Sequence, residues 1–167
     1  MTIKVAILTI SDRSYRGERD DRSGPALVEK VTEQGWKVVQ QDIVPDNVDM
    51  IANKFQSWSA RGDVDLVLSS GGTGFAPRDV TPEATEKVVE RRAPGLAEAM
   101  RAASLEITPH AMLSRARAGI RQRTLIVNLP GSPKAALENL AVIIPVLPHA
   151  VELLQEDPRA EEGHRDV

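Results

Sequence analysis

The chain contains no cysteine, and its three histidines lie far apart in the sequence. Disulfide bonds and thiolate metal sites are therefore excluded, and the histidines show no spacing typical of zinc ligands. The absence of cysteine also fits a reducing compartment. We therefore expect a cytoplasmic protein without zinc.

Long apolar runs and a strong charge of one sign are lacking as well. We find no apolar stretch of the length that a membrane span needs, and the first ten residues do not have the layout of a signal peptide. The formal net charge is only −3, so nucleic acid is not the expected partner. We accordingly expect a protein that acts without a membrane and without nucleic acid.

The length and composition indicate a single folded unit. The chain has 167 residues, of which 41% are hydrophobic and 27% charged, which is the balance of one soluble globular domain. We predict this domain over residues 1–156. Residues 157–167 are charged and poor in large apolar side chains, so we predict a frayed tail there.

Apolar, β-prone runs alternate with helical patterns along this domain. We predict strands at residues 3–10, 36–44, 64–69 and 124–129. Helices are predicted at residues 23–34, 47–61, 81–92 and 96–105, and in a region after residue 132 that two prolines should divide. This alternation predicts an α/β fold, namely a three-layer α/β/α domain with a mostly parallel sheet. In such sheets the ligand lies beyond the carboxyl ends of the strands.

The connection between the third predicted strand and the next helix is long and chemically unusual. It spans about eleven residues, whereas such links in α/β units have roughly 2–6. We place its end at Thr81, read as the helix N-cap, with proline in the first helical position. Glycines after a strand let backbone N–H groups approach an oxyanion, and arginine can pair with phosphate. The candidate phosphate-binding residues are Gly71, Gly72, Thr73, Gly74 and Arg78.

Two aspartates should reach the same rim of the sheet. Asp79 lies in the glycine-rich connection, where a carboxylate repels phosphate unless it carries a metal ion or moves a proton; its alternative role is a local turn or auxiliary cap. Asp46 follows the second strand, and its alternative is the N-cap of the next helix, a role that Asn47 could also fill. Two carboxylates on a phosphate-binding rim are a natural Mg²⁺ site.

The loops after the first and fourth predicted strands should lie at this rim too. Ser11 and Asp12 directly follow the first strand. Pro130 and Gly131 follow the fourth and precede a helix whose free N–H groups can receive an anion. A plain strand-to-helix turn with a good cap explains the second loop equally well.

Arginines are concentrated in residues 113–123. In an extended backbone, alternate arginines share a face and could hold an anionic substrate. A solvated hairpin edge is the alternative for most of the run. Ser114 and Arg115, at its start, are the better candidates for a binding role.

The motifs occur together in one order along the chain: Thr9-Ile-Ser-Asp-Arg13, Ser23-Gly-Pro25, Val44-Pro-Asp46, Gly71-Gly-Thr-Gly74, Arg78-Asp-Val-Thr-Pro-Glu83, Pro94-Gly95, Leu113-Ser-Arg115 and Asn128-Leu-Pro-Gly131. This set resembles the Mog/MoaB family of molybdenum-cofactor biosynthesis, which includes the gephyrin and plant domains that act at the same step. The similarity extends from about residue 3 to residue 154.

The resemblance implies molybdopterin adenylyltransfer. Mg²⁺-ATP would give its AMP to the terminal phosphate of molybdopterin, with release of pyrophosphate. Asp46 and Asp79 match the two essential aspartates of the family and would hold Mg²⁺, while Ser114 and Arg115 would orient the pterin. The family also implies a homotrimer, with a hexamer second, and hand-over of the product to the molybdate-inserting protein.

Two functions of different classes remain open at this point. The first is the adenylyltransferase. The second is a non-catalytic member of the same family that binds molybdopterin, or a partner protein, as a carrier. The chain keeps Asp46, Asp79 and Arg78, which favours the enzyme.

Overall fold

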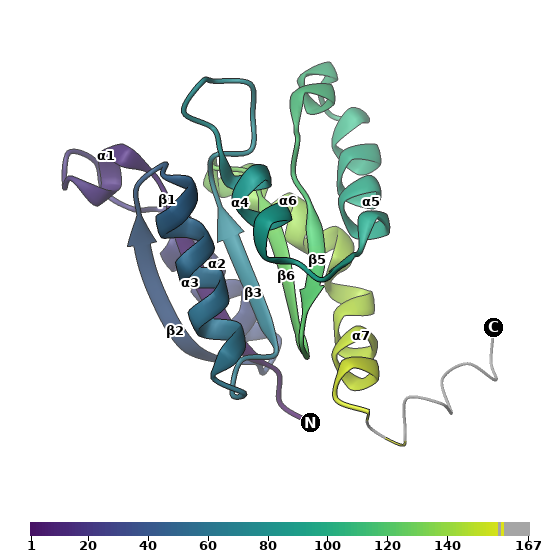
Figure 1. Cartoon of the computed structure of the whole chain (residues 1–167). Helices are drawn as coiled ribbons and strands as arrows, with labels where there is room; N and C mark the ends of the chain where they lie inside the picture. Colours follow the sequence, from purple (N-terminus) through teal and green to yellow (C-terminus); the bar gives the residue numbers. More distant parts are fainter. Residues whose placement is uncertain (157, 159–167) are drawn as a thin grey trace.

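The computed structural model describes residues 1–156 and residue 158, and it contains one six-stranded sheet with helices on both faces (Figure 1). The strands are β1 (Lys4–Ile10), β2 (Lys37–Val44), β3 (Leu66–Ser70), β4 (Arg91–Arg92), β5 (Ala118–Arg121) and β6 (Thr124–Leu129). The helices are α1 (Asp12–Tyr15), α2 (Ser23–Glu33), α3 (Val48–Ala60), α4 (Thr81–Val88), α5 (Pro94–Leu105), α6 (Pro133–Ile143) and α7 (Leu147–Leu154), with 3₁₀ turns η1 (Pro109–Leu113) and η2 (Ile144–Val146). The prediction of an α/β fold with a mostly parallel sheet is confirmed. The predicted tail falls, except for residue 158, outside the described residues.

The order of the strands determines where a ligand can bind. The sheet runs β2-β1-β3-β6-β5-β4, with β2, β1, β3 and β6 parallel to one another and β5 antiparallel to both of its neighbours. The chain moves outward from β1 to β2 and then returns to place β3 on the other side of β1. The crevice at the carboxyl ends of β1 and β3 is therefore the switch point at which open α/β sheets bind ligands.

Both faces of the sheet are buried. Side chains of β1 alternate between two apolar clusters, with Val5 and Ile7 in one cluster and Ala6 and Leu8 in the other. The first cluster includes residues of α2, α5, α6 and α7, and the second includes residues of α3 and α4. This arrangement explains why the strand is apolar on both alternating faces.

The region around α4 differs from the prediction in two ways. Thr81 is the first residue of the helix and not its N-cap, a position that Val80 occupies. The helix ends at Val88 instead of continuing to residue 92, because the next residues pair with β5: the N–H of Glu90 donates to the carbonyl of Ile120 at 2.8 Å. A helical pattern in the sequence cannot show that a neighbouring strand competes for these backbone groups.

The C-terminal helical run corrects the prediction that no apolar stretch of the chain is long enough to span a membrane. Residues Pro133–Leu154 form a helical stretch of 22 residues with mean hydropathy 1.5, long and apolar enough by these two criteria to cross a membrane. The core helix of a soluble protein passes the same test, so the observation is weak evidence for a span. In this structure the 3₁₀ turn η2 interrupts the stretch, and Leu140, Leu147 and Val151 lie in the first apolar cluster. The prediction that prolines divide this region is confirmed.

Candidate functional site

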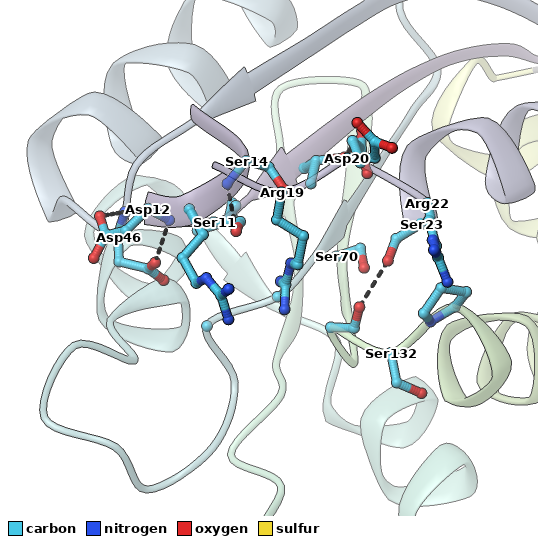
Figure 2. A pocket seen from close by; sticks show the side chains of 18 of the residues that line it. Ser11, Asp12, Ser14, Arg19, Asp20, Arg22, Ser23, Asp46, Ser70 and Ser132 are labelled. Atoms are coloured by element: carbon cyan, nitrogen blue, oxygen red, sulfur yellow. Dashed lines mark hydrogen bonds between the residues drawn. The ribbon is translucent and has the colours of Figure 1, made fainter. Parts of the chain in front are cut away.

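A cavity of about 780 Å³ lies at the carboxyl ends of the parallel strands, and we call it the large cavity (Figure 2). Each of the four parallel strands contributes the residues that follow it. The predicted site residues that line it are Ser11, Asp12, Asp46, Gly71, Gly72, Asp79 and Gly131. The expectation that these loops converge on one rim is confirmed.

Residues 71–80, here called the glycine loop, connect β3 to α4 and rise beyond the end of β3 (Figure 1). Gly71 has a φ of +110° and Gly72 a φ of +65°, which side chains other than glycine rarely adopt. A Cβ at Gly71 would overlap the carbonyl oxygen of Ile10. The hydroxyl of Thr81 donates to the carbonyl of Gly71 at 2.8 Å, so the first residue of α4 holds the start of the loop.

Asp46 and Asp12 hold each other across the ends of β2 and β1. The N–H of Asp12 donates to the Asp46 carboxylate, and the N–H of Asp46 donates to the Asp12 carboxylate, both at 3.0 Å. Asn47, and not Asp46, caps α3, because its side chain accepts from the N–H of Met50. The capping alternative for Asp46 is therefore wrong.

The electrostatic surroundings of these two aspartates differ. Burial raises the pKa of Asp46 above its ordinary value; the N–H of Asp12 opposes the rise, and the carboxylates of Asp12 and Asp79 add to it. Arg78 donates two hydrogen bonds of 2.8 Å to Asp12, and these hold the pKa of Asp12 below its usual range. Asp46 lines the cavity without an ion pair of its own; the charge of Arg78 opposes the rise only in part, so a cation there would relieve the repulsion.

Asp79 lies over the second half of the glycine loop. One of its oxygens accepts from the N–H of Ala76 at 3.0 Å, and a Cβ at Gly74 would come within 2.9 Å of the same oxygen. Asp79 therefore does stabilise the local turn, which was the alternative role predicted for it. The carboxylate also lines the large cavity, close enough to Asp46 to raise its pKa.

A second cavity, here called the small cavity, lies on the other side of the glycine loop. Its volume is about 270 Å³, and its walls come from α5, η1 and α6. Thr73 and Gly74 of the glycine loop line it, together with the predicted residues Ser114 and Pro130. The glycine loop therefore separates two cavities, with Gly71 and Gly72 at one and Thr73 and Gly74 at the other.

The side chain of Arg115 binds the glycine loop itself. Its guanidinium donates to the carbonyl of Gly74 at 2.8 Å and to that of Asp79 at 2.7 Å, and it forms an ion pair with Glu83 of α4. Its backbone N–H donates to the carbonyl of Thr73 at 2.8 Å. Arg115 therefore spans the loop from Thr73 to Asp79 and holds Asp79 through its backbone.

Arg101 of α5 holds the backbone on both sides of Arg115, and sequence reasoning did not predict this role. Its guanidinium donates to the carbonyls of Ser114 and Ala116, at 3.3 and 3.0 Å. No local sequence signal could have found this residue, because an arginine on an amphipathic helix is ordinarily a solvated one. Sequence reasoning also missed Arg19 and Arg22, which line the large cavity. The sequence did contain a signal for these two arginines, because the charged residues 15–22 closely follow Ser11 and Asp12 at the end of the first strand.

A family model described as "Probable molybdopterin binding domain" matches residues 6–149 of the chain. The chain belongs to this family. The resemblance inferred from the motifs is thereby confirmed.

Relatives of known name agree with the family assignment. The molybdopterin adenylyltransferase of Helicobacter pylori is 43% identical over 155 residues, which are 92% of this chain and 88% of the relative. Gephyrin of Dictyostelium discoideum is 43% identical over 96% of this chain, which spans only about a quarter (24%) of that longer protein. The crystal structure of the molybdopterin biosynthesis enzyme MoaB of Thermus thermophilus superposes with a TM-score of 0.88 and 49% identity, covering 94% of this chain and 99% of that one.

Proposed function

We propose that the protein is a molybdopterin adenylyltransferase, which transfers AMP from ATP to the terminal phosphate of molybdopterin. The observation that carries this proposal is the position of the glycine loop between two cavities. Two substrates bound on either side of one loop can meet at its residues. The name of the Helicobacter pylori relative supports the same reaction.

The large cavity is our candidate for the triphosphate of ATP. Five aspartates and three arginines line it, so negative charges are in excess by two. A polyphosphate would be repelled from this lining unless a cation bound there as well. Within residues 1–156, no group of three histidine, aspartate or glutamate side chains could hold a metal by itself. Mg²⁺ fits the lining nonetheless, because it accepts one or two carboxylates and completes its shell with water and substrate phosphates.

Asp46 and Asp79 are the residues that would hold Mg²⁺. Both carboxylates line the large cavity beside the glycine loop; an Asp46 oxygen would lie 3.1 Å from a Cβ built at Gly72. When bound, the ion would neutralise charge on the phosphates of ATP. The chain itself contributes the two carboxylates, the pairing of Asp12 with Arg78 beside them, and the clamp of Arg115 on the loop that carries Asp79.

The small cavity is our candidate for the pterin ring. Ile107, Leu113 and Ala135 supply apolar contacts, and Thr108 and Glu138 supply polar groups at its edge. Apolar walls with a few polar groups are typical of sites that bind flat heterocycles. The pterin phosphate would then approach the large cavity across the glycine loop.

In the proposed step, an oxygen of the terminal phosphate of molybdopterin forms a bond to the α-phosphorus of ATP. The bond from that phosphorus to the oxygen bridging to the β-phosphate breaks, and its electron pair leaves with pyrophosphate. The attacking phosphate is already an anion, so it needs little help from a base. Catalysis therefore depends on positioning and on neutralisation of charge, which the glycine loop and the two aspartates would supply.

A carrier without catalytic activity is the second candidate. One observation favours it, since Asp79 already accepts from Ala76 within the loop and Arg78 is already occupied by Asp12. These partners would give both residues a structural purpose without chemistry.

Incubation with molybdopterin and Mg²⁺-ATP separates the two candidates. We expect mass spectrometry to detect the adenylylated pterin and one pyrophosphate per product, and we expect chelation of Mg²⁺ by EDTA to stop the reaction. Molybdopterin that binds tightly but gains no AMP would establish the carrier instead.

We further propose a homotrimer, with a hexamer as the second possibility, and hand-over of the product to the molybdate-inserting protein. Exposed apolar side chains support association between copies: Ile107 precedes η1, Met112 lies in η1, and Val142 and Val146 lie in α6 and η2. Sedimentation equilibrium tests the assembly. A monomer of 18.2 kDa at micromolar concentration would contradict it.

A further inference from the structure

Three arginines that line the large cavity form no ion pair and no side-chain hydrogen bond within the described residues, although the charge of Arg13 helps to lower the pKa of Glu18. Among the arginines of residues 1–156, only Arg13, Arg19, Arg22 and Arg91 form neither an ion pair nor a side-chain hydrogen bond within that range. The first three line the large cavity. Unpaired arginines are thus concentrated at one place, and Figure 2 shows Arg19 and Arg22 among the residues around that cavity.

The three arginines belong to one segment, which leads from the end of β1 to the start of α2. Arg16 lies in the same segment and forms an ion pair with Glu18, so not every arginine of the segment is free. Asp21, which could have paired with them, is otherwise engaged: it accepts from the hydroxyl of Thr9 at 2.8 Å and from the N–H of Gly24 at 3.0 Å. The guanidinium groups of Arg19 and Arg22 therefore remain available to an anion.

The charges of the large cavity come from different segments. Asp46 and Asp79 follow β2 and β3, whereas the three arginines lie between β1 and α2, together with Asp12, Asp20 and Asp21. Two helices of eleven residues, α2 and α6, also begin at this cavity, with Ser23 and Ser132 in its lining. The positive ends of their dipoles add to the arginines. The β1–α2 segment therefore brings arginines to the cavity, and two of its three aspartates, Asp12 and Asp21, already accept from Arg78, Thr9 and Gly24.

We propose that Arg13, Arg19 and Arg22 bind the β- and γ-phosphates of ATP and then the pyrophosphate that leaves. The inference rests on the proposed function and assigns to these residues the leaving group of that reaction. Guanidinium groups match phosphate oxygens with paired hydrogen bonds. As the bond from the α-phosphorus to the bridging oxygen breaks, negative charge grows on the pyrophosphate. Arginines at that position stabilise the departing group more than the bound ATP.

Binding of pyrophosphate alone tests the site without relying on catalysis. Titration calorimetry in the presence of Mg²⁺ compares pyrophosphate, ATP and AMP for the Arg19→Ser and Arg22→Ser proteins. We expect pyrophosphate and ATP to bind roughly tenfold more weakly for each arginine removed, as for loss of one charge-assisted hydrogen bond. The affinity for AMP, which lacks both outer phosphates, should change by less than about twofold, within ordinary surface effects.

Arg16→Ser is the matched control, because Arg16 lies on the same segment but is paired with Glu18 and does not line the cavity. It should leave all three affinities unchanged. Equal losses for AMP and ATP in the Arg19→Ser and Arg22→Ser proteins would overturn the inference, and so would unchanged pyrophosphate affinity.

Failure of the proposed function gives a different result. If the wild-type protein makes no adenylylated pterin but the arginine variants lose pyrophosphate and ATP affinity selectively, the phosphate site stands and the reaction is wrong. If the product forms but pyrophosphate affinity does not depend on the arginines, the reaction stands and this inference is wrong.

Discussion

The two cavities beside the glycine loop are built from different parts of the fold. The large cavity is formed mainly by segments that follow parallel strands, and eight charged side chains line it. The small cavity has walls from α5, η1 and α6 and about a third of the volume, 270 against 780 Å³. Apolar side chains such as Ile107, Leu113 and Ala135 face it. Parallel strands bring charges together because their carboxyl ends share one edge, whereas packed helices supply apolar walls.

The glycine loop belongs to both cavities, and its two halves are held by different contacts. The first half depends on backbone conformation, with positive φ at Gly71 and Gly72, and on the hydrogen bond from the Thr81 hydroxyl to the carbonyl of Gly71. The second half depends on a side chain, since Arg115 binds the carbonyls of Gly74 and Asp79. Substitutions can therefore disturb the two halves of the loop separately, and Asp79 connects the second half to the large cavity.

The largest effect should come from the carboxylates of the large cavity. Asp79→Asn and Asp46→Asn keep the size of the side chain and its ability to accept a hydrogen bond but remove the charge that would hold Mg²⁺. We expect each to lower adenylyl transfer at least about a hundredfold, the scale of losing one electrostatic stabiliser. Product formation measured by mass spectrometry gives the rate.

The same two variants should fold normally and still bind molybdopterin, because the small cavity is unchanged. If the carboxylates are only structural, each change should cost at most about 1 kcal/mol of stability and leave turnover nearly intact. Turnover like that of the wild type in the Asp79→Asn protein would contradict the catalytic role, and unfolding of that protein would favour the structural one.

A smaller effect should follow when the clamp on the second half of the loop is weakened. Arg115→Lys keeps the positive charge near Glu83 but cannot reach both carbonyls in the planar geometry of a guanidinium. We expect transfer to fall by about ten- to hundredfold, as for one or two charge-assisted hydrogen bonds. Binding of pyrophosphate measured by calorimetry without Mg²⁺ should stay unchanged, because the arginines of the large cavity are untouched and the contribution of Asp79 through the metal is left out.

Arg123→Lys is the control for the clamp. Arg123 pairs with Glu156 and lies near neither cavity, and 60% of its side chain is exposed. It should behave as the wild type in both measurements. A loss of pyrophosphate binding in the Arg115→Lys protein would show that the two halves of the loop do not act separately.

The smallest effect should come from filling the small cavity. Ala135→Leu places three more carbon atoms in a space of about 270 Å³. We expect the dissociation constant of molybdopterin to rise about tenfold, the scale of overpacking a well-filled site. The affinity for ATP should not change. Ala141→Leu, on the exposed face of the same helix, is the control, and equal effects from both changes would argue against the pterin assignment.

Much of the candidate site could be predicted from the residues alone. The apolar runs predict four parallel strands, and their carboxyl ends necessarily meet at one edge, so Asp46, Asp79 and the glycine loop are expected together. The role of Arg115 could not be foreseen, because the carbonyls that it binds come from residues 36 and 41 positions away. The sequence indicates a cap at Thr81, and the bond of this residue to Gly71 is visible only with the loop in place.

The sequence by itself determined the order of strands and helices, the family, and which residues follow the carboxyl ends of the parallel strands, because these depend on local periodicity and on motifs. Only the tertiary structure decided that the glycine loop divides two cavities and that Arg101 and Arg115 hold the loop and the segment beside it. It also decided that Arg19 and Arg22 line the large cavity without a partner among the described residues. Such features depend on contacts between residues far apart in the chain, where the partner of a charged side chain is chosen by packing and not by sequence neighbours.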